Sequence, residues 1–291
     1  MAEHSQEVKS VAASPVAGPT VFRRQLGRQL RRLRGDVSVD AIVTNPLLGI
    51  SRAKLFKMEA GKHPVKPQDV AVLCQHYQAA AGETEALTAL ALATQGDSWW
   101  HVYGDASVPD WFSLYLDVEP AAAEIRTYEA ELIPGLLQTL EYARAVYRAR
   151  NPDADPAEIE RRVALRMERQ AILTRVDPAP PKLHVVLNEA VVLRQVGGSA
   201  IMNAQVARLR EAARLPHISI DVLPLGAGAH AAMETAFVIL TFANPSDDPS
   251  VVYIDTPSSA AYLQKQVDLD RYATIFEHVS KQSVSILEYP V

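Results

Sequence analysis

The chain has 291 residues, which at roughly 100 to 200 residues per domain is enough for about two domains and at least one sizeable hydrophobic core. Hydrophobic residues make up 48% and charged residues 22%, and this balance excludes a chain that is disordered throughout. The formal net charge of -5, read as an average, argues against a nucleic-acid-binding protein.

Cysteine usage and the absence of long apolar runs set two further bounds. The single cysteine, Cys74, excludes an intramolecular disulfide framework and any multi-cysteine zinc or iron–sulfur site. Residues 1–10 lack the apolar core of a signal peptide, and no run approaches the roughly 18 apolar residues of a membrane span. We therefore expect a cytoplasmic protein with no membrane contact and no cofactor.

The average charge conceals a basic segment near the N-terminus. Residues 1–20 are small, polar and proline-bearing, which is typical of a flexible leader. From Phe22 to Pro67 there are eleven lysines and arginines against three acids. This stretch carries +8 and the rest of the chain -13, so residues 21–80 are predicted to form a separate basic domain.

Four short helices are predicted in the basic domain from apolar spacing and from helix-capping residues. They cover about residues 22–34, 38–45, 52–60 and 67–77. Ser38 and Ser51 are placed to begin the second and third helices, and Gly35 and Gly61 to end the first and third. Pro46 biases Asn45 away from helical dihedrals and so stops the second helix.

Two helices joined by a short turn form the layout that places a helix in the major groove of DNA. Leu55 and Met58 are expected to face the core, which turns the basic residues of the third helix outward, toward phosphates and guanine edges. The predicted DNA contacts are Ser51, Arg52, Lys54, Lys57, Lys62 and Arg31. Glu59 is expected to pair internally with an arginine of the first helix. The alternative for the basic residues is a solvated face without a nucleic-acid partner.

Residues 81–110 are predicted to form a helical and aromatic connector. Trp99, Trp100 and Trp111 lie close together in sequence with Phe112. These aromatic residues either pack between the connector and the following domain, which is the more ordinary role, or line an apolar ligand pocket.

The remaining residues, 111–291, are predicted to form an α+β domain with a small, largely antiparallel sheet. Residues 117–150 read as helical with a break at Pro134 and Gly135, and Asp155 caps a helix that runs to about Leu173. Apolar and β-branched runs predict strands over 183–187, 218–223, 237–242 and 251–254. Two more helices are expected over 201–214 and 269–279.

Two features of this domain are candidate ligand or partner sites. Arg161, Arg162, Arg166 and Arg169 lie at helical spacing and form either a solvated surface, with Arg162 paired to Glu158, or a site for an anion or an acidic partner, for which Arg162, Arg166 and Arg169 are the candidates. His230 ends a glycine-rich loop that lacks the spacing of a phosphate loop and is predicted to be a mobile lip of a pocket.

Catalytic and metal-binding patterns are absent from the sequence. Glu129 and Glu131 are two residues apart and would diverge in a helix, so they are not expected to form an acid–base pair. The histidines are scattered without HExxH spacing, and no GxSxG is present. We expect no catalytic residues, no metal and no enzymatic activity.

The segments LGRQLRRLR (26–34) and GISRAKLFKMEAGKHPVKPQDV (49–70) resemble the helix-turn-helix domain of Cro and xenobiotic-response-element (XRE) regulators. Residues 110–139 (DWFSLYLDVEPAAAEIRTYEAELIPGLLQT) and 222–230 (VLPLGAGAH) resemble the large C-terminal domain, of unknown function, that accompanies it in filamentous actinobacteria. The resemblance implies a homodimeric DNA-binding transcriptional regulator that reads double-stranded operator DNA. It also implies a sensing or partner-binding C-terminal domain, whose partner would be a small protein encoded nearby.

Two departures from that family leave a second function open. Val39 follows Ser38 where relatives usually carry a glutamine that bonds a DNA phosphate, and Asn45 and Pro46 lengthen the link to the third helix. We expect weaker or altered operator binding. In the alternative function, the helix-turn-helix has drifted and the chain is an interaction protein that binds a small protein through its acidic domain.

Overall fold

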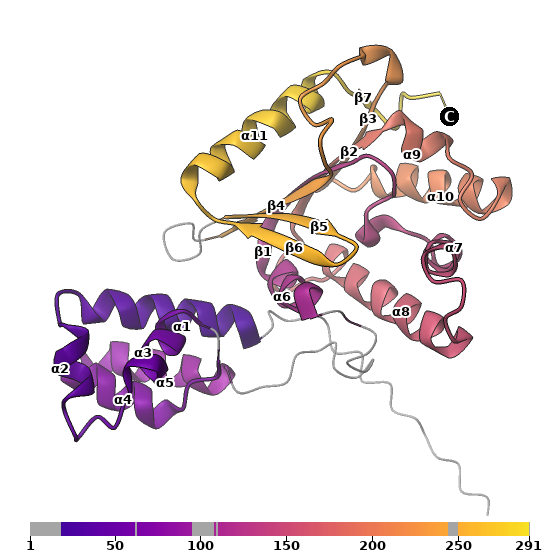
Figure 1. Ribbon diagram of the computed structural model, residues 1–291. Helices are drawn as coiled ribbons and strands as arrows, with labels where there is room; N and C mark the ends of the chain where they lie inside the picture. Colours follow the sequence, from indigo (N-terminus) through magenta and orange to yellow (C-terminus); the bar gives the residue numbers. More distant parts are fainter. Residues whose placement is uncertain (1–18, 62, 95–107, 109, 244–249, 291) are drawn as a thin grey trace, which may run out of the picture.

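A computed structural model describes residues 19–61, 63–94, 108, 110–243 and 250–290. Within these ranges the N-terminal part is a bundle of five helices, drawn from indigo to purple in Figure 1. They are α1 (Pro19–Arg34), α2 (Val39–Val43), α3 (Arg52–Glu59), α4 (Pro67–His76) and α5 (Ala81–Ala93). The predicted leader over residues 1–20 falls almost entirely outside the described residues.

The helix ends follow the capping chemistry expected from the sequence. The hydroxyl oxygen of Ser38 accepts a hydrogen bond from Ala41 N, and that of Ser51 accepts one from Lys54 N. Gly35, directly after α1, has φ +48°, a backbone conformation that favours glycine. The four helices predicted in the basic domain are confirmed, and their apolar sides meet in one core that includes the buried Cys74.

The C-terminal part contains a mixed sheet with helices on both faces. Its helices are α6 (Asp110–Val118), α7 (Leu140–Arg150), α8 (Pro156–Arg169), α9 (Glu189–Leu193), α10 (Ser199–Ala212) and α11 (Gln266–Lys281). Its strands are β1 (Ala122–Glu129), β2 (Lys182–Asn188), β3 (Ile218–Leu223), β4 (Phe237–Phe242), β5 (Val251–Thr256), β6 (Ser259–Leu263) and β7 (Val284–Ser285). Short 3-10 turns occupy Glu119–Ala121, Gly135–Leu137, Gln170–Leu173 and Leu225–Ala227.

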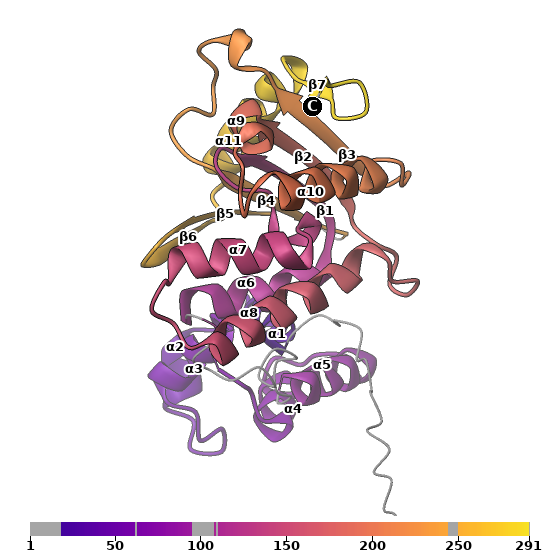
Figure 2. The same cartoon turned by 90° about the vertical axis from the view of Figure 1, so that its right-hand side faces the viewer.

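The strand order is β6-β5-β4-β1-β2-β3-β7. The central pairs β1–β2 and β2–β3 are parallel, and the outer pairs of the described strands are antiparallel. Helix α11 covers one face and α7 to α10 cover the other (Figures 1 and 2). Because side chains alternate along a strand, Val185 and Leu187 enter the core on the α7–α10 side, whereas Val186 enters the core beneath α11.

The predicted α+β class is confirmed, but one stretch of the expected secondary structure is wrong. Residues 122–129 form the central strand β1 instead of a helix. The alanines and glutamates there have a high helix propensity. Ile125, Thr127 and Tyr128 are β-branched or aromatic residues, which favour a strand. Pairing with β2 on one side and β4 on the other decides the outcome, since tertiary contacts override propensity.

Helix α6 joins the two parts of the molecule. It lies at the edge of the sheet domain, beside β6, and contacts α1 of the bundle (Figures 1 and 2). The charges of Arg23 in α1 and Asp117 in α6 interact across this contact. None of the helices that the structure describes is long and apolar enough to cross a membrane.

Candidate functional site

Helix α3 has a buried side and an exposed basic side. Leu55 and Met58 are buried in the bundle core, as predicted, and Arg52 and Lys57 lie on the opposite, exposed surface. Phe56 is also on this surface and is 48% exposed. This is the orientation in which a helix presents its charged side chains to a DNA groove while its apolar side anchors it.

Acidic neighbours pair with part of this basic surface. Arg52 forms an ion pair with Asp40 of α2, and Lys54 Nζ lies 2.8 Å from a carboxylate oxygen of Asp69 in α4. Lys57 has no ion-pair partner among the described residues. Its ammonium group is therefore the α3 charge that is most available to a phosphate.

The other predicted DNA contacts have different environments. Ser51 is exposed, and its hydroxyl oxygen is used as the helix cap. Arg31 is exposed on α1, and Lys62 lies outside the described residues. The predicted internal pair is confirmed, because Arg34 Nε donates to Glu59 Oε1 at 2.6 Å and Nη2 donates to Oε2 at 3.2 Å. This pair ties the end of α1 to α3.

The connection between α2 and α3, which contains Asn45 and Pro46, is an ordered turn. The Asn45 side chain accepts a hydrogen bond from Leu47 N at 3.0 Å, and Leu48 N donates to Asn45 O. Leu48 and Ile50 pack into the bundle core, whereas Leu47 is 87% exposed. The turn is thus anchored to the same core as α3.

A second feature is a cavity of about 820 Å³ in the C-terminal domain. It opens between the β1 face of the sheet and helices α6, α7 and α8, with the loop after β1 as a further wall. This volume lies within the roughly 300 to 1,000 Å³ range of small-molecule sites. Aromatic residues from α6, α7 and β5 line it, namely Phe112, Tyr115, Tyr147 and Tyr253.

Strand β1 supplies one wall through alternate residues. Ile125, Thr127 and Glu129 all line the cavity, because residues two apart on a strand share a face. Glu129 and Glu131 do not lie on a helix, as the prediction that they diverge assumes, because Glu129 ends β1 and Glu131 follows the strand. Both glutamates line the same cavity.

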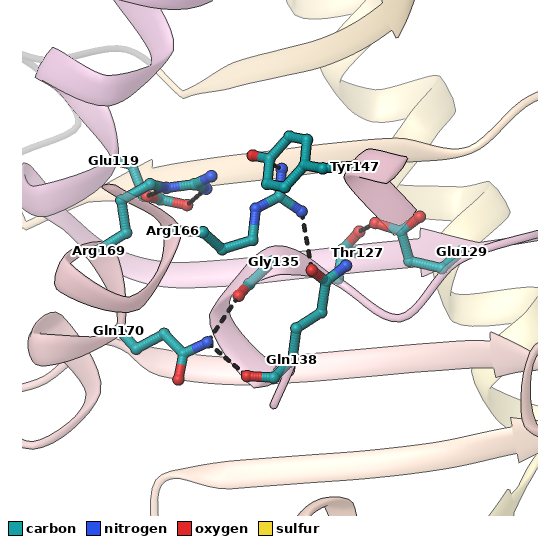
Figure 3. A network of polar contacts seen from close by, with 9 residues as sticks. All are labelled: Glu119, Thr127, Glu129, Gly135, Gln138, Tyr147, Arg166, Arg169 and Gln170. Carbon is teal, nitrogen blue, oxygen red and sulfur yellow. Dashed lines mark hydrogen bonds and ion pairs between the residues drawn. The ribbon is translucent and has the colours of Figure 1, made fainter. Parts of the chain in front are cut away.

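The environment of Glu129 favours its neutral form. Burial raises the pKa of its carboxyl from 4.5 to about 8. Thr127 Oγ1 lies 3.2 Å from Glu129 Oε1 (Figure 3) and 3.0 Å from the carbonyl oxygen of Phe237. The threonine hydroxyl has one hydrogen for these two acceptors, and its contact with Glu129 lowers the pKa of the carboxyl by less than burial raises it.

Arg166 is positioned by two neutral partners. Its Nη1 donates to Gln138 Oε1 at 3.0 Å, its Nη2 donates to the Tyr147 hydroxyl at 2.7 Å, and the guanidinium lies over the Tyr147 ring (Figure 3). Gln138 is fixed in turn, because its Nε2 donates to the carbonyl oxygen of Ile133 at 2.7 Å. No carboxylate pairs with Arg166 among the residues that the structure describes.

Arg169 forms a buried ion pair beside it. Its Nε and Nη2 donate to the two carboxylate oxygens of Glu119 at 2.9 and 2.8 Å, and both side chains are less than 10% exposed. A Cβ atom on Gly135 would lie 3.3 Å from Arg169 Nη1 and 3.4 Å from Arg166 Nη1. The glycine therefore leaves room for two neighbouring guanidinium groups.

The arginines of α8 are thus divided between surface and interior. Arg162 pairs with Glu158 at 2.5 Å, as predicted. The expectation that the whole row is a solvated surface is wrong for Arg166 and Arg169, because the α8 face that carries them turns toward the sheet. The polar residues of the loop after β1, and Gln138 above all, carried no sequence signal, since they meet Arg166 only in the folded domain.

The other predicted ligand residues lie away from this geometry. Trp99 and Trp100 are outside the described residues, and Trp111 belongs to α6. His230 does not line the cavity, and its ring contacts Tyr128, which belongs to the core beneath α11. Of the predicted aromatic cluster, Phe112 lines the cavity.

Another polar group, on the α11 side of the sheet, contains a serine, a histidine and an aspartate. His184 Nε2 lies 2.7 Å from Asp221 Oδ2 and 3.5 Å from Ser280 Oγ. A nucleophilic triad needs the acid and the hydroxyl on different ring nitrogens, whereas here both face the same nitrogen. Among the described residues no cluster of three or more His, Cys, Asp or Glu side chains is arranged to hold a metal ion.

Each of the two parts of the chain matches a known protein-family model. Residues 25–87 match a model described as a helix-turn-helix domain, and residues 112–288 match a model described as a domain of unknown function, DUF5753. Neither the curated proteins nor the solved structures contain a match to this chain. Because the second match covers more than half of the 291 residues, the chain belongs to the DUF5753 family and carries a helix-turn-helix domain at its N-terminal end.

Proposed function

We propose that this protein is a sequence-specific DNA-binding transcriptional regulator whose C-terminal domain binds a small molecule. The exposed basic side of α3, opposite the buried Leu55 and Met58, carries the DNA-binding proposal. The helix-turn-helix match agrees with it, and the segments quoted above favour the XRE type. A regulator of this kind works where the DNA is, so a cytoplasmic location is part of the proposal.

In this function α3 enters the major groove. Lys57 and Arg31 contact phosphates, and Arg52 exchanges its partner Asp40 for DNA. A homodimer would place two copies of α3 in successive major grooves roughly 34 Å apart. The acidic remainder of the chain would be repelled by DNA, which leaves the bundle as the DNA-binding part.

The cavity supports a sensing role for the C-terminal domain. Phe112 and Tyr115 of α6 line it, and the same helix contacts α1 of the bundle. A ligand that moves α6 would therefore change the support on which the DNA-binding bundle rests. We assign the domain a binding role without catalysis.

A second candidate is an interaction protein with a small protein partner. Exposed Leu47 and Phe56 lie on or near α3, and Arg52 and Lys54 are already paired with acids. An apolar, partly neutralised surface is better suited to a protein than to phosphates. The salt dependence of DNA binding separates the two candidates.

The test of DNA binding uses the full-length protein. Duplexes are selected from a random library, and affinity for the enriched sequence is then measured by fluorescence anisotropy over a range of salt concentrations. The logarithm of the binding constant should fall steeply with the logarithm of salt concentration. Lys57→Gln should reduce this slope by about 1, because one phosphate contact is lost.

Lys281→Gln is the matched control, since it removes the same charge from an exposed lysine at the end of α11. It should leave the slope unchanged. A slope near zero, or no enriched sequence, would refute the DNA-binding role and favour the interaction protein. Equal effects of the two substitutions would refute the assignment of Lys57.

A further inference from the structure

The ionisable residues that line the cavity do not cancel one another. Two ion pairs are internally neutral, namely Glu119 with Arg169 and Glu131 with Arg194. Asp255 and Arg150 are both exposed, and the charge of Asp255 interacts with those of Arg150, Arg166 and Arg169. Burial raises the pKa of Glu129 and so favours its neutral form, and Arg166 forms no ion pair with a carboxylate among the described residues. Both features favour an anion in the cavity.

Hydrogen-bond donors also remain unused. Tyr253 is 4% exposed and lines the cavity, and its hydroxyl group has no hydrogen-bond partner in the described part of the chain. The Nε atom of Arg166 is likewise buried without a partner. Buried donors normally have partners, so these two unpaired donors beside the cavity favour a ligand that accepts hydrogen bonds.

Much of the rest of the lining is apolar or aromatic. Ile125 and Val238 from the sheet, Ile133 from the loop after β1 and Val146 from α7 surround the charged end together with the aromatic rings. A surface of this kind gains most from burying an apolar body. A small inorganic anion would leave most of the cavity unfilled.

We propose that the cavity binds an organic monoanion, a carboxylate on an apolar and preferably aromatic body, with the carboxylate held by Arg166. This inference rests on the ligand-binding role proposed above and specifies its chemistry. A cationic ligand would meet two guanidinium groups and a neutral Glu129. A neutral ligand would leave Arg166 without a counterion.

Three probes that share one ring system test the charge preference. They are 2-naphthoate, 2-naphthamide and 2-naphthylmethylamine, which carry a negative charge, no charge and a positive charge at neutral pH. Isothermal titration calorimetry on the full-length protein measures each affinity. We expect 2-naphthoate to bind about tenfold or more tightly than the amide, as a charge-assisted hydrogen bond requires, and the amine to bind weakest.

Variants of α8 assign the preference to one side chain. Arg166→Gln should reduce 2-naphthoate affinity to that of the amide and leave amide affinity unchanged. Arg166→Lys keeps the charge and should keep the preference, which covers the case in which the glutamine variant fails to fold. Arg161→Gln is the matched control, because Arg161 is exposed on the same helix and does not line the cavity. It should change none of the three affinities.

The outcomes separate this inference from the function on which it rests. If the amine binds tightest, or the amide equals 2-naphthoate, the anion inference is overturned while the cavity remains a ligand site. If all three fail to bind below about 1 mM, the cavity loses its ligand-binding role as well. Loss of preference in Arg166→Lys together with retention in Arg166→Gln would also overturn the inference. The DNA-binding role is judged separately, by the salt slope.

Discussion

Glu129 couples the stability of the C-terminal domain to pH. Its pKa is raised by burial to about 8, from 4.5 in an exposed carboxyl. Between these values the unfolded chain has released a proton that the folded chain keeps, so the free energy of unfolding falls as pH rises. The limiting slope is about 1.4 kcal/mol per pH unit, and the loss ends above about pH 8.

Glu129→Gln should abolish this loss. Two other charged groups act on Glu129, since Asp255 raises its pKa and Arg166 lowers it, and both stay in place in the variant. The difference in urea-unfolding free energy between variant and wild type should therefore grow in favour of the variant from about pH 5 to pH 8. Measurements at several pH values across this window give the slope directly.

Glu131→Gln is the control, because that carboxylate lines the same cavity but is 70% exposed in its pair with Arg194. The free energy of unfolding of Glu131→Gln should change with pH in the same way as that of the wild type. If the free energy of unfolding of Glu129→Gln also has the pH dependence of the wild type, Glu129 is ionised in the folded protein. The cavity then contains one more negative charge.

Helices α1 and α3 approach each other so closely that one glycine is required. A Cβ atom on Gly27 would lie 2.5 Å from the carbonyl oxygen of Met58 and 2.6 Å from that of Glu59. These are backbone atoms near the end of α3, so no side-chain rotation relieves the clash. Gly27→Ala should push the two helices apart and lower the free energy of unfolding of the bundle by about 1 to 3 kcal/mol.

Gly82 in α5 is the control position, because the same glycine-to-alanine substitution can be made there without a close contact. A Cβ atom there meets nothing within 4 Å, and the residue is exposed in a helix. Gly82→Ala should be neutral or stabilise by up to about 1 kcal/mol, since alanine restricts the unfolded chain and favours the helix. Urea unfolding of both variants tests the close approach of α1 and α3. If the two substitutions change the free energy of unfolding equally, Gly27 is not required for that approach.

The elements that the sequence predicts well are those whose signals are local. Ser51, the spacing of Leu55 and Met58, and Gly61 together place α3 almost to the residue. Strand β1 has no such signal, because its neighbours β2 and β4 lie more than 50 residues away in sequence. The cavity is unpredictable for the same reason, since Glu129, Gln138 and Arg166 belong to separate elements that only the folded sheet brings together.

At the scale of the whole molecule, the two parts have separate hydrophobic cores. Among the described residues, the core of the bundle runs from Leu26 to Ala91 and the clusters of the C-terminal domain begin at Val108. The contact between them is made by α1 and α6, where Arg23 faces the charge of Asp117. Cooperative unfolding follows shared cores, so we expect two units that unfold separately.

Differential scanning calorimetry of the full-length protein should therefore show two transitions. Gly27→Ala should lower the midpoint of one, and Arg169→Met, which strands the buried Glu119, should lower the other. Duplex DNA at low salt should raise only the transition that Gly27→Ala lowers, and 2-naphthoate only the one that Arg169→Met lowers, because a ligand stabilises the unit that binds it. A single transition that both substitutions lower would refute this independence, and would mean that the α1–α6 contact makes the regulator one cooperative body.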